Sequence, residues 1–230
     1  MPQTAQTAYA TTLTRVESYF DGTATKTWER LTSDAPVSRI RQTVREGRDK
    51  MRALMLSRLP EDLRGARVLD AGCGTGAMTE ALALRGATVM AADISPKLVQ
   101  IAQDRLPEAL RPQASFHAGD MTDAALGRFD FVVAMDSLIY YDAADIARTL
   151  HALGQRAGAV VFTVAPRTPL LMVMWNAGKL FPRSDRSPVM IPHSLKDLGR
   201  ATGPGLAKVG RVSRGFYISD CMEYSLGGRP

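Results

Sequence analysis

Three glycines and an acid lie within seven residues of a predicted strand–turn–helix unit. Residues 67–77 read R-V-L-D-A-G-C-G-T-G-A, so that Gly72, Gly74 and Gly76 follow Asp70 at alternate positions. Glycines in such a turn allow positive φ angles and a close approach of the backbone to a ligand. The turn also fits the dinucleotide-binding pattern G-x-G-x-x-G/A, which on its own is a weak signal.

Asp70 distinguishes between two classes of ligand for this turn. A dinucleotide would bring a pyrophosphate here, and a nearby carboxylate would oppose it electrostatically in a low-dielectric crevice. S-adenosylmethionine instead brings an amino acid group whose ammonium is attracted by an acid. The string D-A-G-C-G-T-G resembles the first motif of class I S-adenosylmethionine-dependent methyltransferases. We therefore predict S-adenosylmethionine as the cofactor, bound in this turn by Asp70, Gly72, Cys73, Gly74 and Gly76.

Two further acids follow the next two predicted strands. Asp93 could bind both ribose hydroxyls, with Ile94 packing on the adenine. Asp120 could accept from the adenine amino group, with Met121 covering the ring. The alternative is that these acids only cap a helix and a turn. Acids at the carboxyl ends of three successive strands favour one ligand crevice, and Met135, after the fourth strand, completes the predicted cofactor-binding set.

The elements that must position these residues alternate along the chain. Short apolar segments predict strands at 66–71, 87–92, 114–118, 129–134 and 158–164. Helical patterns lie at 76–85, 95–106 and 142–153. This alternation predicts a doubly wound α/β fold, mostly parallel and Rossmann-like, as in class I methyltransferases. Two closely joined runs in the tail, 207–214 and 216–226, bring the sheet to seven strands and predict antiparallel pairing at its edge.

The regions outside this alternation are predicted to cover the site. Residues 1–36 are predicted to form a mobile N-terminal arm, and 37–230 the methyltransferase domain. The domain begins with an amphipathic helix at 37–59, whose middle is weakened by Gly47. Prolines between 166 and 193 surround an apolar stretch that predicts an inserted helical lid, followed by a helix near 194–202.

The composition limits the classes of partner. The 230 residues carry a net charge of +6, but the basic residues are dispersed, which argues against nucleic acid as a partner. The two cysteines form no metal-binding pattern and suggest a reducing compartment. With no signal peptide and no apolar run long enough to span a bilayer, a cytoplasmic location is expected.

Four segments outside the glycine turn point to a narrower family. They are residues 16–34, V-R-E-G-R-D-K-M, M-D-S-L-I-Y-Y and R-G-F-Y-I-S. Together they resemble the magnesium protoporphyrin IX O-methyltransferases of chlorophyll and bacteriochlorophyll biosynthesis, which carry the segments Y-F-N-x-T-G-F-x-R-W, I-R-x-G-x-x-K, L-D-x-L-I-H-Y and R-F-Y-F. The chain departs from this pattern at Ala24, Thr25 and Thr27, and it has Tyr140 where the family has histidine.

The resemblance implies a reaction and a set of acceptor residues. The expected reaction is methylation of one propionate of magnesium protoporphyrin IX, giving its 13-monomethyl ester. A propionate with a pKa of about 4.3 is ionised at pH 7, so it needs no general base. Catalysis can then come from proximity, alignment and exclusion of water. Tyr19 and Tyr140 are the expected catalytic residues, and Trp28, Trp175 and His193 are expected to bind the substrate; no protein-bound metal is expected.

The resemblance also implies partners, and it leaves alternatives open. It implies peripheral contact with the photosynthetic membrane and contact with the large subunit of magnesium chelatase. The first alternative is a methyltransferase acting on a quinone or another small aromatic hydroxyl, which would need a base in the crevice. The second is an RNA-binding protein or RNA methyltransferase, whose binding would depend steeply on salt. For Tyr19 and the other acceptor candidates, the alternative role is ordinary packing.

Overall fold

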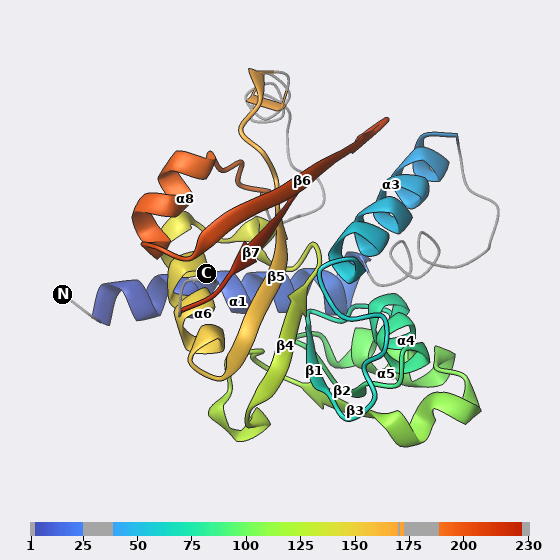
Figure 1. Ribbon diagram of the computed structural model, residues 1–230. Coiled ribbons are helices and arrows are strands. Elements are labelled where there is room, and N and C mark those ends of the chain that lie inside the picture. The colour runs from blue at the N-terminus through green and yellow to red at the C-terminus, as the bar shows by residue number, and fades with distance from the viewer. Residues whose placement is uncertain (1–2, 25–38, 170, 173–188, 227–230) are drawn as a thin grey trace.

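A single seven-stranded sheet organises the protein (Figure 1). The computed structural model describes residues 3–24, 39–169, 171–172 and 189–226. The strand order is β3-β2-β1-β4-β5-β7-β6, in which β1 to β5 are mutually parallel and β7 is antiparallel to both β5 and β6. The predicted doubly wound sheet and the antiparallel pairing at its edge are therefore confirmed, with β7 as the strand that runs against the others.

The strands begin and end close to the predicted positions. They are β1 (Arg67–Ala71), β2 (Thr88–Asp93), β3 (Ala114–Ala118), β4 (Phe129–Ala134), β5 (Ala157–Val164), β6 (Leu206–Arg214) and β7 (Tyr217–Tyr224). In this register Asp70 of β1 lies beside Ala91 of β2 and Val133 of β4. The carboxyl ends of these three strands are therefore level, and the segments that follow them meet at one edge.

Helices cover both faces of the sheet (Figure 1). They are α1 (Gln3–Tyr19), α3 (Arg39–Leu56), α4 (Ala77–Leu84), α5 (Pro96–Arg105), α6 (Ala143–Gly154) and α8 (Leu195–Thr202). Alternate strand residues face opposite cores: Val68 packs in the cluster formed with α3 and α4, and Leu69 in the cluster formed with α6 and α8. Ser95 caps α5, as its position before Pro96 predicts, by accepting from the backbone N–H of Leu98.

Gly47 has a packing role in the middle of α3. A β-carbon there would lie 2.7 Å from atoms of the Tyr217 side chain on β7. The residue that weakens the helix by propensity is therefore the one that lets α3 approach the sheet closely. This approach places the polar face of α3 next to the carboxyl ends of the strands.

The described part of the N-terminal arm is α1 and the short π-helical turn η1 (Phe20–Ala24). Val16 and Phe20 pack against Leu98 of α5, and the Asp21 carboxylate accepts from the hydroxyl of Ser95. Mobility of the arm stays a prediction. Trp28 lies outside the described residues.

The inserted segment begins and ends at neighbouring positions. Pro166 and His193 form an isolated bridge, and the N–H of His193 donates to the carbonyl of Ala165 at 2.8 Å. The start of the predicted lid helix is described, since residues 171 and 172 are helical and the N–H of Met172 donates to the carbonyl of Thr168 at 2.9 Å. Trp175 lies outside the described residues. Among the helices that the structure describes, none is long and apolar enough to cross a membrane.

Candidate active site

A cavity of about 640 Å³ opens at the carboxyl ends of β1, β2 and β4. Its walls come from the glycine turn, the segment after β4, one face of α3 and the end of the N-terminal arm. The predicted site residues among its lining are Asp70, Gly72, Cys73, Gly74, Asp93, Met135 and Tyr140. Residues predicted from separate segments of the chain thus meet in one cavity.

The glycine turn has the backbone geometry that its sequence predicts. Gly72 and Gly74 have φ angles of 84° and 54°. A β-carbon on Gly72 would lie 2.3 Å from the Cβ atom of Ser137, so this position excludes any larger residue. Gly76, at φ 89°, precedes α4 and packs against Ala102 of α5. It is absent from the cavity lining, which favours a packing role over direct contact with a ligand.

Asp70 lies in β1, before the turn rather than within it. Its carboxylate is buried and accepts from the hydroxyl of Thr79, in the first turn of α4, at 2.6 Å. Burial raises the pKa of Asp70 to about 7, the Thr79 hydrogen bond opposes this shift, and the charge of Asp93 adds to it. The acid therefore fixes the start of α4 as well as lining the cavity.

Asp93 holds the two segments that frame the predicted ribose site. One carboxylate oxygen accepts from the N–H of Gly74 at 2.8 Å, and the other accepts from the N–H of Ser95 at 3.0 Å. Burial raises the pKa of Asp93, and both backbone hydrogen bonds oppose that shift. Asp93 therefore does not cap α5 itself, whose cap is Ser95, but it supports the turn before that cap and also lies in the cavity wall.

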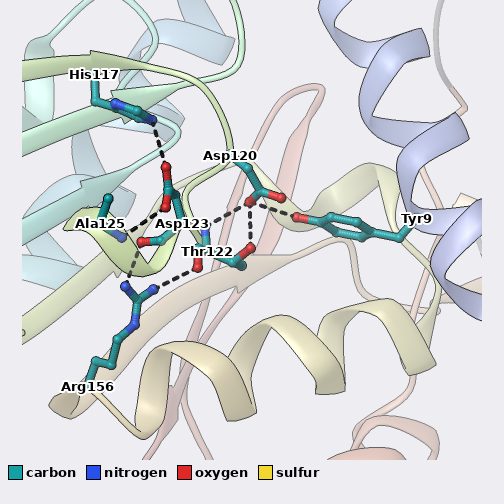
Figure 2. Close-up of polar contacts among 7 residues, drawn as sticks. All are labelled: Tyr9, His117, Asp120, Thr122, Asp123, Ala125 and Arg156. Atoms are coloured by element: carbon teal, nitrogen blue, oxygen red, sulfur yellow. Dashed lines mark hydrogen bonds and ion pairs between the residues drawn. The ribbon is translucent and has the colours of Figure 1, made fainter. Parts of the chain in front are cut away.

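Asp120 is engaged by the N-terminal helix (Figure 2). Its Oδ1 atom accepts from the hydroxyl of Tyr9 at 3.0 Å, and from both the N–H and the hydroxyl of Thr122 at 2.8 Å. Asp120 and Met121 are absent from the cavity lining. One oxygen of the carboxylate that is expected to accept from an adenine amino group is thus hydrogen-bonded to Tyr9 of α1.

The two predicted catalytic tyrosines lie in one apolar cluster, together with Ile94 and Phe20. Tyr140 lines the cavity, and its ring lies 6.2 Å from that of Phe20. Burial raises the pKa of Tyr140, and the nearby Asp136 and Tyr19 add to this effect. From this part of the arm, however, Phe20 and Val16 reach the cavity wall, whereas Tyr19 packs beside them.

His193 lies at the base of the inserted segment, away from the cavity lining. Its Nε2 atom is 2.9 Å from the carbonyl oxygen of Tyr141, to which it can donate. Burial lowers the pKa of His193, so the neutral ring is favoured. These contacts favour a structural role for His193 over the predicted binding of substrate.

The arginine face of α3 was missed at the sequence level. Arg45, Arg48 and Arg52 line the same cavity as the acids of the sheet. Their spacing of three and four residues places them on one face of a helix, and this spacing is the signal that could have found them. Asp136, directly after Met135, also lines the cavity and pairs with Arg48 at 2.5 Å.

The donors in the cavity wall suit an organic cofactor. Within the described ranges, no group of three or more His, Cys, Asp or Glu side chains could hold a metal ion. The glycine turn lines the cavity, together with the buried carboxylates of Asp70 and Asp93 and the guanidinium groups of α3. A zwitterionic ligand with a ribose fits this distribution of charge and donors.

Two family models match the chain. Residues 68–156 match a methyltransferase domain, and residues 134–225 match the C-terminus of magnesium-protoporphyrin IX methyltransferase. The chain is also 65% identical to the magnesium-protoporphyrin O-methyltransferase of Rhodobacter capsulatus over 218 residues, which cover 94% of this chain and 97% of that protein. The chain belongs to the magnesium-protoporphyrin O-methyltransferase family.

More distant members of the family match over a similar length. The magnesium-protoporphyrin O-methyltransferase of a Synechocystis strain is 31% identical over 91% of this chain and 94% of its own length. The crystal structure of the Synechocystis PCC 6803 magnesium protoporphyrin IX methyltransferase with bound SAH matches with a TM-score of 0.77 and 30% identity, covering 91% of this chain and 97% of that one. The methyltransferase fold predicted from the glycine turn is thus confirmed.

Proposed function

We propose that this protein transfers the methyl group of S-adenosylmethionine to a propionate carboxylate of magnesium protoporphyrin IX, giving the 13-monomethyl ester. The observation that carries this proposal is the 65% identity to the Rhodobacter capsulatus enzyme over nearly the full length of both chains. The cavity supports it, because its lining holds both acids suited to a cationic cofactor and arginines suited to an anionic acceptor.

The cofactor would be held by the wall formed from the sheet. Gly72 and Gly74 allow close backbone contact, Asp93 faces the ribose, and Asp70 attracts the ammonium group. When bound, S-adenosylmethionine supplies a methyl group on a positively charged sulfur, whose transfer to a carboxylate oxygen gives a neutral ester and a neutral thioether without loss of a proton. Ile94, Asp120 and Met121 complete the proposed adenine site once α1 gives up its bond to Asp120.

The acceptor would lie against the wall formed by the arm and the segment after β4. Phe20 and Tyr140 supply aromatic surface for a flat apolar macrocycle, and the Tyr140 hydroxyl can orient a carboxylate. Because a propionate is already ionised, no side chain has to remove a proton. The protein's contribution is to align the carboxylate and exclude water, with Trp28 and Trp175 as proposed parts of the cover.

The decisive experiment supplies both substrates to the purified protein. Incubation with S-adenosylmethionine and magnesium protoporphyrin IX should give one product, heavier than the porphyrin by one methyl replacing hydrogen. Fragmentation of the product should place the ester on the 13-propionate. The control substrate is a phenol of the quinone pathway, which should remain unmethylated. If the phenol is turned over and the porphyrin is not, the proposal fails.

We also propose that the protein meets its partners at the photosynthetic membrane, with magnesium chelatase supplying the substrate. The net charge of +6 supports weak binding to anionic lipid. Flotation with anionic vesicles at low salt should recover the protein, and recovery should fall at high salt as the charges are screened. Vesicles of neutral lipid are the control, and equal recovery on both would contradict an electrostatic contact.

A further inference from the structure

Arg48 and Asp136 form a fixed ion pair within the cavity wall. Arg48 Nη1 donates to Asp136 Oδ2 at 2.5 Å, and the side chains are only 17% and 8% exposed. The pair joins the middle of α3 to the segment that follows β4, which are 88 residues apart in sequence. A guanidinium held this way loses little further freedom when it binds a second planar anion.

Asp136 is itself held in an unusual conformation. Its φ angle of 57° makes it the one non-glycine residue with positive φ among the residues that the structure describes. Its Oδ1 atom accepts from the hydroxyl of Tyr217 at 3.0 Å and from that of Thr163 at 3.2 Å, while its N–H donates to the Thr163 hydroxyl at 2.7 Å. Backbone strain that is held by such a network is typical of functional sites.

The pair shares one cavity with residues of the predicted cofactor site and with Tyr140 of the predicted acceptor site. Arg52, one helical turn from Arg48, acts electrostatically on Asp70. On the other side, Asp136 raises the pKa of Tyr140 and Arg48 lowers it, so both charges are close to that hydroxyl. All of these residues line the same cavity. A carboxylate bonded to Tyr140 would therefore lie in the same cavity as the Arg48 guanidinium.

We propose that Arg48 binds the propionate that becomes methylated, and that Asp136 is the positioning residue that aims it. This inference rests on the proposed function. The guanidinium carries five N–H donors in a planar fork, so it can hold Asp136 and a substrate carboxylate together. Because Asp136 offsets the charge of Arg48, the substrate oxygen keeps its nucleophilic character while its direction is fixed. Methylation removes the charge of the propionate that Arg48 binds, so the ester is held more weakly and can leave.

Binding measurements on two porphyrins test the contact directly. The probes are magnesium protoporphyrin IX and its dimethyl ester, titrated through the Soret band, with circular dichroism as a check of folding. The wild-type protein should bind the diacid more tightly than the diester. Arg48→Gln should weaken binding of the diacid by about 10- to 100-fold, the range for hydrogen bonds to a charged group, and leave binding of the diester nearly unchanged. The affinity of Arg48→Lys for the diacid should lie between those of the wild type and Arg48→Gln, because lysine keeps the charge but lacks the planar guanidinium.

Kinetics separate the role of Asp136 from that of Arg48. Asp136→Asn keeps the shape and tolerates positive φ, but it no longer fixes the guanidinium. We expect kcat to fall at least tenfold while KM for the porphyrin stays within about twofold, whereas Arg48→Gln should mainly raise KM. The matched control is Arg214→Gln, which removes an exposed ion pair between β6 and Glu46 of α3, at 2.7 Å, outside the cavity. Its activity should equal that of the wild type.

The failure of this inference is distinct from failure of the proposed function. If the wild-type protein makes no porphyrin ester, the proposed function falls. If it makes the ester and Arg48→Gln still distinguishes diacid from diester as the wild type does, the assignment of Arg48 is overturned. If Arg48→Gln binds both porphyrins more weakly to the same extent, the assignment is also overturned, because a residue that contacts the carboxylate should affect only the diacid.

Discussion

The carboxylate of Asp93 accepts a hydrogen bond from the backbone N–H of Gly74 at 2.8 Å. Through its other oxygen it also accepts from the N–H of Ser95 at 3.0 Å, so one side chain ties the end of β2 to the glycine turn and to the cap of α5. The residue expected to bind the ribose therefore also builds the surface on which the cofactor lies. Substitutions at this position should affect both the stability of the turn and the affinity for the cofactor, and separate measurements distinguish the two effects.

Asp93→Ala should weaken binding of S-adenosylmethionine by at least about 1.5–3 kcal/mol, as for hydrogen bonds to a charged group, since the turn and the ribose both lose their acceptor. Asp93→Asn keeps one acceptor oxygen and should lose less. Calorimetry on both variants, with their thermal unfolding recorded alongside, measures the two effects. Unchanged affinity in a folded Asp93→Ala protein would remove Asp93 from the cofactor site.

Asp70 should make the stability of the cofactor-free protein depend on pH. Its pKa is raised from 3.8 to about 7 in the folded state, because burial disfavours the charged form. Between these values the folded protein holds a proton that the unfolded chain has lost. The stabilising contribution is therefore complete below about pH 4 and disappears as the pH rises through about 7.

Urea unfolding at pH 5 and pH 8 measures this effect, with Asp70→Asn as the matched variant that cannot titrate. The free energy of unfolding of the wild type, relative to the variant, should fall between the two pH values. Equal pH dependence in the two proteins would contradict the raised pKa.

Tyr9→Phe should change the affinity for S-adenosylmethionine rather than the fold. The Tyr9 hydroxyl donates to one carboxylate oxygen of Asp120, the residue that is predicted to accept from adenine (Figure 2). Removing this competing donor should tighten cofactor binding by about 2- to 10-fold, in line with a net hydrogen bond of about 0.5–1.5 kcal/mol. Asp120→Asn is the companion variant and should weaken binding. Weaker binding by Tyr9→Phe would mean that Tyr9 stays on the site when the cofactor binds.

Two helical glycines should respond oppositely to alanine. In an exposed helix, Gly→Ala stabilises by roughly 0.5–1 kcal/mol through backbone entropy. A methyl group added at Gly199 in α8 would meet no described atom within 4 Å, so Gly199→Ala should show this gain. Gly47→Ala in α3 places a methyl 2.7 Å from Tyr217 and should destabilise instead. Thermal unfolding of both variants tests this, and a stabilised Gly47→Ala protein would mean that α3 does not pack closely on β7.

The strands and helices could be predicted because their signals are local. Strands β3 and β4 have the bounds expected from their apolar runs, and the Ser95–Pro96 pair marks the start of α5. The glycine turn and Asp93 could be placed in one cavity because parallel strands bring their carboxyl ends to the same edge.

The remaining features of the site depend on contacts between distant segments. Arg48 meets Asp136 across 88 residues, and Tyr9 meets Asp120 across 111 residues. No spacing in the sequence predicts either contact. The left-handed backbone of Asp136 also has no sequence signal comparable to that of a glycine. The arginine face of α3 was visible as a helical spacing, but its direction depended on how Gly47 packs against Tyr217.

The pH dependence of the rate tests the carboxylate mechanism most directly. With both substrates saturating, a propionate with a pKa of about 4.3 is fully ionised throughout the neutral range, so the rate should stay nearly flat from about pH 6.5 to 9. Tyr140→Phe should lower that plateau, by up to about 100-fold if its hydroxyl aligns the carboxylate, without tilting it. Tyr19→Phe is the comparison, and it should lower the plateau further if the arm supplies the catalytic contact. A phenolic acceptor would instead give a rate that climbs with pH as the hydroxyl or its base loses a proton. A steep rise on saturating porphyrin would therefore contradict methylation of a free carboxylate.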